Sequence, residues 1–148
     1  MKMQIFKTSD QLSPALLRIT LGLVVLAHGV QKLFGWFDGY GFSSTMSYFT
    51  DSVGLPWALG FFIVMLETAG ALALIAGLAT RLVALSYIGL AIGIVMKVHL
   101  GNWFFMNWFN NHAGEGYEFF ILWVGIAVAL VILGGGRYSL DKLIAGGG

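Results

Sequence analysis

Cysteine is absent from this sequence of 148 residues. Its absence excludes disulfides, thiolate metal ligands and thiol relays of the CxxC type. Charged residues are also scarce, at 10% of the chain, whereas a soluble domain carries about a quarter. The net charge is +1 and no basic run is present, so we expect no nucleic-acid partner.

Apolar residues take the place of charge: 58% of the chain is hydrophobic and its mean hydropathy is +0.84. A helix needs roughly 20 residues to cross the hydrocarbon core of a bilayer. Stretches of suitable length lie at about residues 12–34, 56–79, 82–100 and 117–133. Since no segment alternates as a barrel strand does, we predict an all-α, four-transmembrane-helix bundle that forms a single domain over residues 1–148.

Basic residues gather on one side of this predicted bundle. That side contains the two tails and the turn between the second and third spans. They are Lys2, Lys7, Arg81, Arg137 and Lys142. The loops on the other side contain Asp38, Asp51 and Glu115. Because the cytoplasmic side of membrane proteins is enriched in Lys and Arg, we predict that both termini are cytoplasmic.

The two predicted outer loops are long and rich in aromatic residues. In the first, Phe42, Met46, Phe49 and Val53 recur at helical spacing, which predicts a short amphipathic helix. The second contains Trp103, Phe104, Phe105, Trp108 and Phe109. Trp favours the membrane interface, so an interfacial belt explains this loop, and a lid over an outward-facing pocket is the alternative.

Ionisable side chains inside the spans are the most informative feature, since each costs about 2.5 to 3.5 kcal/mol at mid-membrane. One stripe of the first span contains Arg18, Gly22, Val25, His28, Gly29 and Lys32. At 100° per residue these residues lie within a sector of about 120°. This stripe should therefore face the bundle, while Gln31 points elsewhere.

Glu67 lies near the middle of the second span, on a face with Gly60, Gly70, Ala71 and Leu74. A carboxylate at that depth must be protonated or find a cation, and Arg18 and His28 are the candidates. One interpretation is a fixing interaction between helices without chemistry. The other is a functional site.

The third span has a GxxxG spacing at Gly89 and Gly93, which predicts close helix contact. Several polar residues then approach the outer ends of their helices, with Glu67 beneath them. They are His28, Lys32, Lys97, His99 and Glu118. This common depth predicts a polar pocket that opens outward.

The segments LRITLGLVVLAHGVQKLFGWF, GLP, FIVMLETAGALALIAGLATRL and GYEFFILWVGIAVALVILGGGRYSLD, in this order, resemble the DoxX family of small bacterial membrane proteins. The resemblance covers about residues 17–141. The matching positions are His28, Lys32, Gly35, Glu67, Gly70, Arg81, Tyr117 and Glu118. The resemblance implies a four-helix bundle in the bacterial cytoplasmic (inner) membrane. It also implies a quinone-linked redox role, because the family name traces to a small subunit of a thiosulfate:quinone oxidoreductase.

Quinone chemistry needs an apolar slot, donors to the ring oxygens and a group that exchanges protons near neutral pH. Glu67, His28 and Lys32 are the predicted catalytic set. Residues predicted to line the binding site are Arg18, Lys97, His99, Tyr117 and Glu118, and Tyr87, Tyr117 or Trp103 could stack on a ring. The chain has no motif for a flavin or a dinucleotide, so a protein partner is expected to supply the electrons.

Other functions compete with this hypothesis. His28 and His99 could hold a haem, and a metal site could use His28, Glu67, His99 and Glu118. A non-enzymatic assembly or accessory protein, or a binder of a small lipophilic metabolite, would need only the fixed helices. A channel needs broken helices or an inverted repeat and, with four helices, a homo-oligomer.

Overall fold

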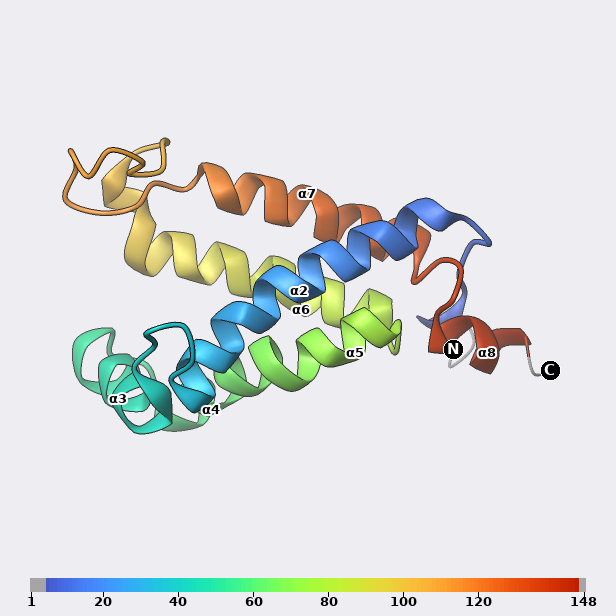
Figure 1. The fold of residues 1–148 in the computed structure, drawn as a ribbon, viewed down its shortest axis with the longest axis horizontal. Helices are drawn as coiled ribbons and strands as arrows, with labels where there is room; N and C mark the ends of the chain where they lie inside the picture. Colours follow the sequence, from blue (N-terminus) through green and yellow to red (C-terminus); the bar gives the residue numbers. More distant parts are fainter. Residues whose placement is uncertain (1–4, 147–148) are drawn as a thin grey trace.

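The computed structural model describes residues 5–146, and within that range the chain is helical without strands (Figure 1). Lys2, one of the basic residues behind the predicted orientation, lies outside the described residues. Three continuous helices are long and apolar enough to cross a membrane: Leu12–Phe34, Trp57–Ala76 and Thr80–Asn102. The predicted all-α class is confirmed, and the chain is a multi-pass membrane protein.

Helix α2, Leu12–Phe34, is an uninterrupted α-helix of 23 residues. It ends at Gly35, whose φ of 74° is left-handed and whose N–H donates to the carbonyl of Gln31. Glycine adopts this conformation without a steric penalty, which makes it the common terminator of helices. The side chain of Gln31 donates to Phe37 O at 3.2 Å, away from the bundle, as predicted.

The second long helix consists of α4 (Trp57–Met65), a π-helical turn η2 (Leu66–Gly70) and α5 (Ala71–Ala76). It begins directly after Pro56, where proline is tolerated because a first-turn N–H needs no helical acceptor. A π turn inserts one extra residue per turn and is frequent at functional sites. Here it contains Glu67.

The third long helix, α6 (Thr80–Ile94), continues through a π turn η3 (Val95–His99) and a short 3₁₀ turn η4 (Leu100–Asn102). It forms the predicted tight hairpin with α5. The connection lies at residues 77–79, earlier than the predicted residues 80–81, because Gly77 ends α5 at a φ of 71° and α6 has already begun at Thr80.

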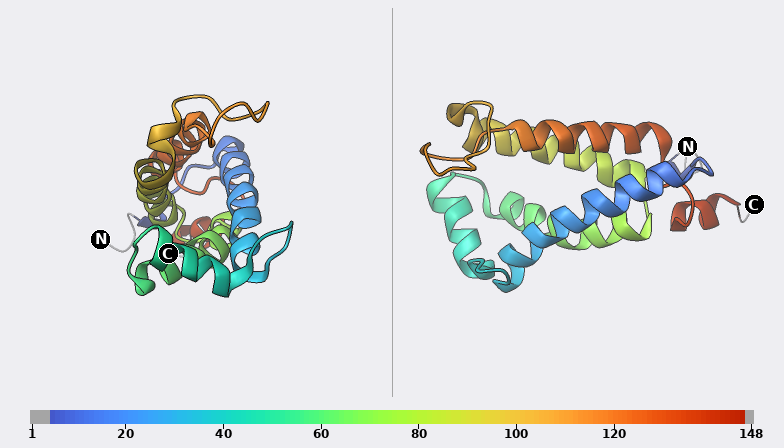
Figure 2. Two further views of the ribbon diagram at one scale, coloured as in Figure 1. Left: turned by 90° about the vertical axis from the view of Figure 1, so that its left-hand side faces the viewer. Right: turned by 45° about the horizontal axis from the view of Figure 1, so that its top comes forward.

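The helices pack as two antiparallel pairs, α2 with the second long helix and α6 with α7 (Glu118–Leu133). Contacts of α2 with α7 and of α5 with α6 join the pairs. Figure 2 shows both termini at one end of the bundle and α3 with the loop before α7 at the other. The buried core follows the axis through Val25, Leu74, Tyr87, Trp123 and Leu130.

The predicted amphipathic helix in the first loop is present as α3 (Gly41–Ser47), which continues into a π turn η1 (Tyr48–Ser52). Met46 is buried on its inner face, and Phe42 meets Phe61 edge-on with ring centroids 6.2 Å apart. Apolar residues one helical turn apart therefore attach this loop to α4.

The prediction that Gly89 and Gly93 mark a close helix contact is wrong. A Cβ added at either position would meet no atom within 4 Å, because α6 packs through the opposite face, which contains Ala84, Tyr87 and Ala91. The close glycine contacts lie on α2 instead. A Cβ at Gly22 would approach Ile75 Cγ1 to 2.6 Å.

Candidate functional site

A buried ion pair joins α2 to the π turn of the second long helix. Lys32 Nζ lies 2.6 Å from Glu67 Oε2, and the side chains are 26% and 2% exposed. The cation that neutralises Glu67 is therefore Lys32, rather than Arg18 or His28. Nearly all the exposure of the pair belongs to the Lys32 side chain, so an approaching molecule would meet Lys32 first.

The π turn is held by hydroxyl groups that bond its backbone. Tyr87 Oη donates to Leu66 O at 3.1 Å, and Thr68 Oγ1 donates to Val64 O at 2.7 Å. Backbone carbonyls in a widened turn need partners when they are buried. The first bond holds the residue before Glu67, and the second ties Thr68, the residue after it, to the last turn of α4.

Gly29 lets α2 approach this turn. A Cβ added at Gly29 would clash with the carbonyl of Glu67 and would lie 2.7 Å from Thr68 Cγ2. Lys32 follows Gly29 by three residues, so both lie on one face of α2. The close approach at Gly29 therefore brings the ammonium group of Lys32 to the carboxylate.

His28, predicted as catalytic, lies on the exposed side of α2. Its ring centroid is 6.3 Å from that of Phe119 on α7. The predicted stripe of α2 is otherwise buried, at Arg18, Gly22, Val25 and Gly29. His28 thus occupies the edge of the stripe, one helix position before Gly29, where α2 faces the second helix pair.

Lys97 and His99 both lie in η3 but have different surroundings. Lys97 is exposed, whereas His99 Nδ1 lies 2.7 Å from the carbonyl of Glu115 and the ring packs 5.0 Å from Phe120. This contact ties the end of the third long helix to the loop before α7. The function of His99 visible in the structure is therefore in anchoring that loop.

Glu118 and Tyr117 anchor the same loop. Glu118 Oε1 accepts from Met106 N at 3.0 Å and from Trp108 Nε1 at 3.2 Å, and the ring of Tyr117 lies edge-on to Phe104 at 5.7 Å. The aromatic side chains of the loop project outward: Trp103 is 82% and Phe109 88% exposed. This exposure fits the interfacial belt better than a closed lid.

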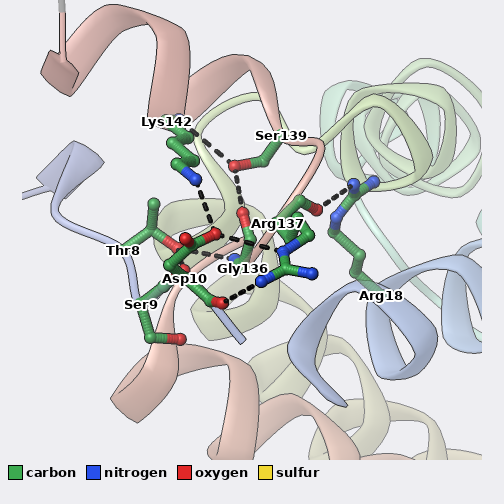
Figure 3. Close-up of polar contacts among 8 residues, drawn as sticks. All are labelled: Thr8, Ser9, Asp10, Arg18, Gly136, Arg137, Ser139 and Lys142. Carbon is green, nitrogen blue, oxygen red and sulfur yellow. Dashed lines mark hydrogen bonds and ion pairs between the residues drawn. The ribbon is translucent and has the colours of Figure 1, made fainter. Parts of the chain in front are cut away.

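Arg18 lies at the opposite end of α2, in a cage of backbone carbonyls. Its guanidinium donates to Gly135 O at 2.8 Å, to Tyr138 O at 2.7 Å and also to Ile75 O, although the side chain is 2% exposed. Figure 3 shows Arg18 beside the segment that follows α7. The structure therefore separates Arg18 from the Lys32–Glu67 pair and gives it a role in joining the segment after α7 to the bundle.

The residues proposed for a metal site are not brought together. Among residues 5–146, no three His, Asp or Glu side chains lie close enough to hold a metal ion. The two histidines proposed for a haem pack on neighbouring phenylalanines of α7, His28 on Phe119 and His99 on Phe120. The geometry therefore favours the ion pair as the candidate site.

An apolar groove of about 290 Å³ lies between the last turn of α6 with η3 and the first turns of α7. Its lining consists of Ala91, Ile92, Val95, Met96, Tyr117, Phe120, Ile121 and Val124. It contains Tyr117 from the predicted binding set and shares no residue with the ion pair.

Fold and site together define a small helical membrane protein with a buried lysine–glutamate pair. The DoxX family model matches residues 13–100, which include both residues of the pair. The chain belongs to the DoxX family. It is also similar to the Bacillus subtilis (strain 168) protein named "Putative oxidoreductase CatD", with 28% identity over 137 residues that cover 92% of this chain and 90% of the relative. No solved structure shows a significant match.

Sequence reasoning missed some of the residues that shape the site. Lys32 was expected in the pocket but not as the partner of Glu67, and the bond of Tyr87 to Leu66 O was not foreseen. A signal for the pairing was available, because Lys32 and Glu67 are the ionisable residues of their helices nearest the end of the bundle that contains α3. The π turn has no comparable signature in the sequence.

Proposed function

We propose that the chain is the membrane subunit of a quinone-linked oxidoreductase, with the Lys32–Glu67 pair as the group that binds quinone oxygen and exchanges its protons. The observation that carries the proposal is the pair itself: a 2.6 Å ionic contact between two helices, with a carboxylate 2% exposed. Ionisable residues inside a membrane protein are costly and commonly mark proton or substrate pathways.

The proton chemistry follows from the different exposure of the two side chains. A quinone takes up two electrons and two protons when it becomes a quinol. The Lys32 side chain, 26% exposed, can donate a hydrogen bond from its ammonium group to a carbonyl oxygen and pass on one proton. It takes up a proton from solvent before it passes on the second. Glu67 keeps the ammonium group of Lys32 oriented through their 2.6 Å contact. Tyr87, through the carbonyl of Leu66, and Gly29, through its contact with the backbone of Glu67, act as positioning residues.

The electrons come from a redox partner protein in this proposal. The sequence has no cysteine and no flavin or dinucleotide motif. The name of the B. subtilis relative, "Putative oxidoreductase CatD", supports a redox role. A complex would place this chain as the quinone-binding and membrane-anchoring component.

The proposed topology has α7 as a fourth span and both termini on the cytoplasmic side of the bacterial inner membrane. α7 has 16 residues, or about 24 Å of helix, slightly shorter than the hydrocarbon core. It pairs along α6, and Tyr117 precedes it at the outer boundary. Arg81, Arg137 and Lys142 lie at the terminal end, in accordance with the positive-inside rule.

A structural function is the second candidate, and a specific observation favours it. The ion pair and the close approach at Gly29 both hold α2 against the second long helix. A purely structural contact between two helices would do the same. In that case the protein is an accessory or assembly factor, or binds a lipophilic metabolite without transforming it.

A titration with a short-chain quinone separates the two functions. The fluorescence of Trp123, which is 3% exposed and lies 5.6 Å ring to ring from Tyr87, reports on the interior near the site. We expect saturable quenching in the wild type and weaker binding in Lys32→Gln and Glu67→Gln. Trp123→Phe shows how much of the signal arises at that position. Quenching that is linear and equal in all folded variants would support the structural function.

A further inference from the structure

The two ends of the bundle differ in charge. At the terminal end, the described cations are Lys7, Arg18, Arg81, Arg137 and Lys142, and the described acids are Asp10 and Asp141. The opposite end has Asp38, Asp51, Glu115 and Glu118, with Lys97 as a cation outside the ion pair. The terminal end is therefore electropositive.

Two of these cations share a single carboxylate. Lys142 Nζ lies 2.5 Å and Arg137 Nε 3.2 Å from the same oxygen of Asp10, Oδ1 (Figure 3). One negative charge cannot neutralise both. The cluster therefore has an excess positive charge, and its side chains are 43%, 46% and 62% exposed for Lys142, Arg137 and Asp10.

A groove of about 700 Å³ lies over this cluster. Its lining consists of Asp10, Arg137, Tyr138, Ser139, Leu140, Lys142, Leu143 and Gly146. The groove therefore combines the two cations with apolar side chains of α8 (Leu140–Gly146). Leu143 is 71% and Tyr138 78% exposed.

The groove lies where a membrane surface is expected. Asp10 comes two residues before α2 begins at Leu12, and Arg137 comes four residues after α7 ends at Leu133. Basic residues directly beyond membrane helices attract anionic lipid headgroups. Exposed Tyr138 and Leu143 suit the interface and the first carbons of an acyl chain.

We propose that this groove is a binding site for the headgroup of an anionic glycerophospholipid, with Arg137 and Lys142 on the phosphate and α8 along the acyl chain. Asp10 occupies the position of the phosphate when no lipid is bound and competes with it. Lipid binding at the site then also fixes the junction between the two termini, because Arg137 and Lys142 flank the segment that Arg18 holds.

The test uses the full-length protein in detergent, with native mass spectrometry to measure bound phosphatidylglycerol and phosphatidylcholine. Lys142→Gln should weaken phosphatidylglycerol binding about five-fold, the effect of one basic residue near a membrane surface. Asp10→Asn should strengthen it several-fold, because the competing carboxylate is gone. Lys7→Gln is the matched control: it removes the same charge at the same end, outside the groove, and should leave binding within about two-fold of wild type.

The site is refuted if Lys7→Gln weakens binding as much as Lys142→Gln, since diffuse attraction would then suffice. Equal affinity for phosphatidylcholine, or weaker binding in Asp10→Asn, would also overturn it. Inorganic phosphate at the same concentration as the lipid tests whether a free anion occupies the groove. Complete displacement of the lipid by phosphate would contradict the lipid assignment. Thermal unfolding without lipid should change little in Lys142→Gln, because an exposed ion pair contributes little and Arg137 still pairs with Asp10.

Discussion

Removal of one partner of the Lys32–Glu67 pair should destabilise the protein far more than removal of both. Lys32→Met leaves a carboxylate that is 2% exposed without its cation. Breaking a buried pair in this way costs about 3 to 5 kcal/mol. Since the Lys32 side chain is 26% exposed, part of its charge is already solvated, and we expect the lower end, about 3 kcal/mol.

The double variant Lys32→Met, Glu67→Leu should lie within about 1 kcal/mol of wild type, because apolar replacement of a whole buried pair is often neutral. Glu67→Gln should cost about 1 to 2 kcal/mol, since the amide retains a hydrogen-bond acceptor. The measurement is thermal unfolding in detergent, followed by circular dichroism, for the four proteins of the cycle, which are the wild type, Lys32→Met, Glu67→Leu and the double variant, with Glu67→Gln beside them. The reasoning is refuted if Lys32→Met costs less than about 1 kcal/mol, or if the double variant is as unstable as the single one.

Five further substitutions test the surroundings of the site and the terminal junction. Gly29→Ala should lower the free energy of unfolding by about 1 to 3 kcal/mol, because the added Cβ meets the backbone of Glu67. Gly89 faces open space, so Gly89→Ala should cause no measurable change in the same unfolding assay. Arg18→Gln should lower the free energy of unfolding by at least about 3 kcal/mol and reduce expression, since several buried carbonyls lose their hydrogen-bond donor. Tyr87→Phe should lose about 1 kcal/mol and still unfold cooperatively; an unchanged midpoint would contradict its bond to the π turn. Hydrogen bonds from Lys142 and Arg137 lower the pKa of Asp10. The Asp10 carboxylate therefore stabilises the fold above the ordinary pKa of an aspartate, about 3.9, and this stabilisation fades as the pH falls below that value. The difference in unfolding midpoint between wild type and Asp10→Asn should disappear at low pH.

The bundle could be predicted from the sequence because the membrane imposes a length on apolar helices. The range predicted for the first span, residues 12–34, is the observed helix α2. The buried stripe of α2 also followed from helical periodicity, since Arg18, Val25 and Gly29 are buried. Periodicity assigns a residue to a face and says nothing about the helix opposite it.

That limit explains why the site was predicted only in part. The common depth of Lys32, His99 and Glu118 in the sequence predicted one pocket. In the structure Lys32 pairs with Glu67, whereas His99 and Glu118 contact the loop before α7. The loop is held by hydrogen bonds from specific backbone atoms, such as the bond from Met106 N to the Glu118 carboxylate. Such contacts depend on chain geometry rather than on composition. The GxxxG spacing failed for a related reason, because an apolar face of α6 can meet lipid as readily as a helix.

The most direct test of the proposed function is to map where a photoreactive quinone analogue binds to the purified protein, by peptide mass spectrometry after illumination. The Lys32–Glu67 pair predicts labels on α2 near Lys32 and on η2, which an excess of unlabelled quinone removes and Lys32→Gln reduces. Labels confined to the lining of the apolar groove between α6 and α7, unaffected by Lys32→Gln, would contradict the assignment of quinone chemistry to this ion pair.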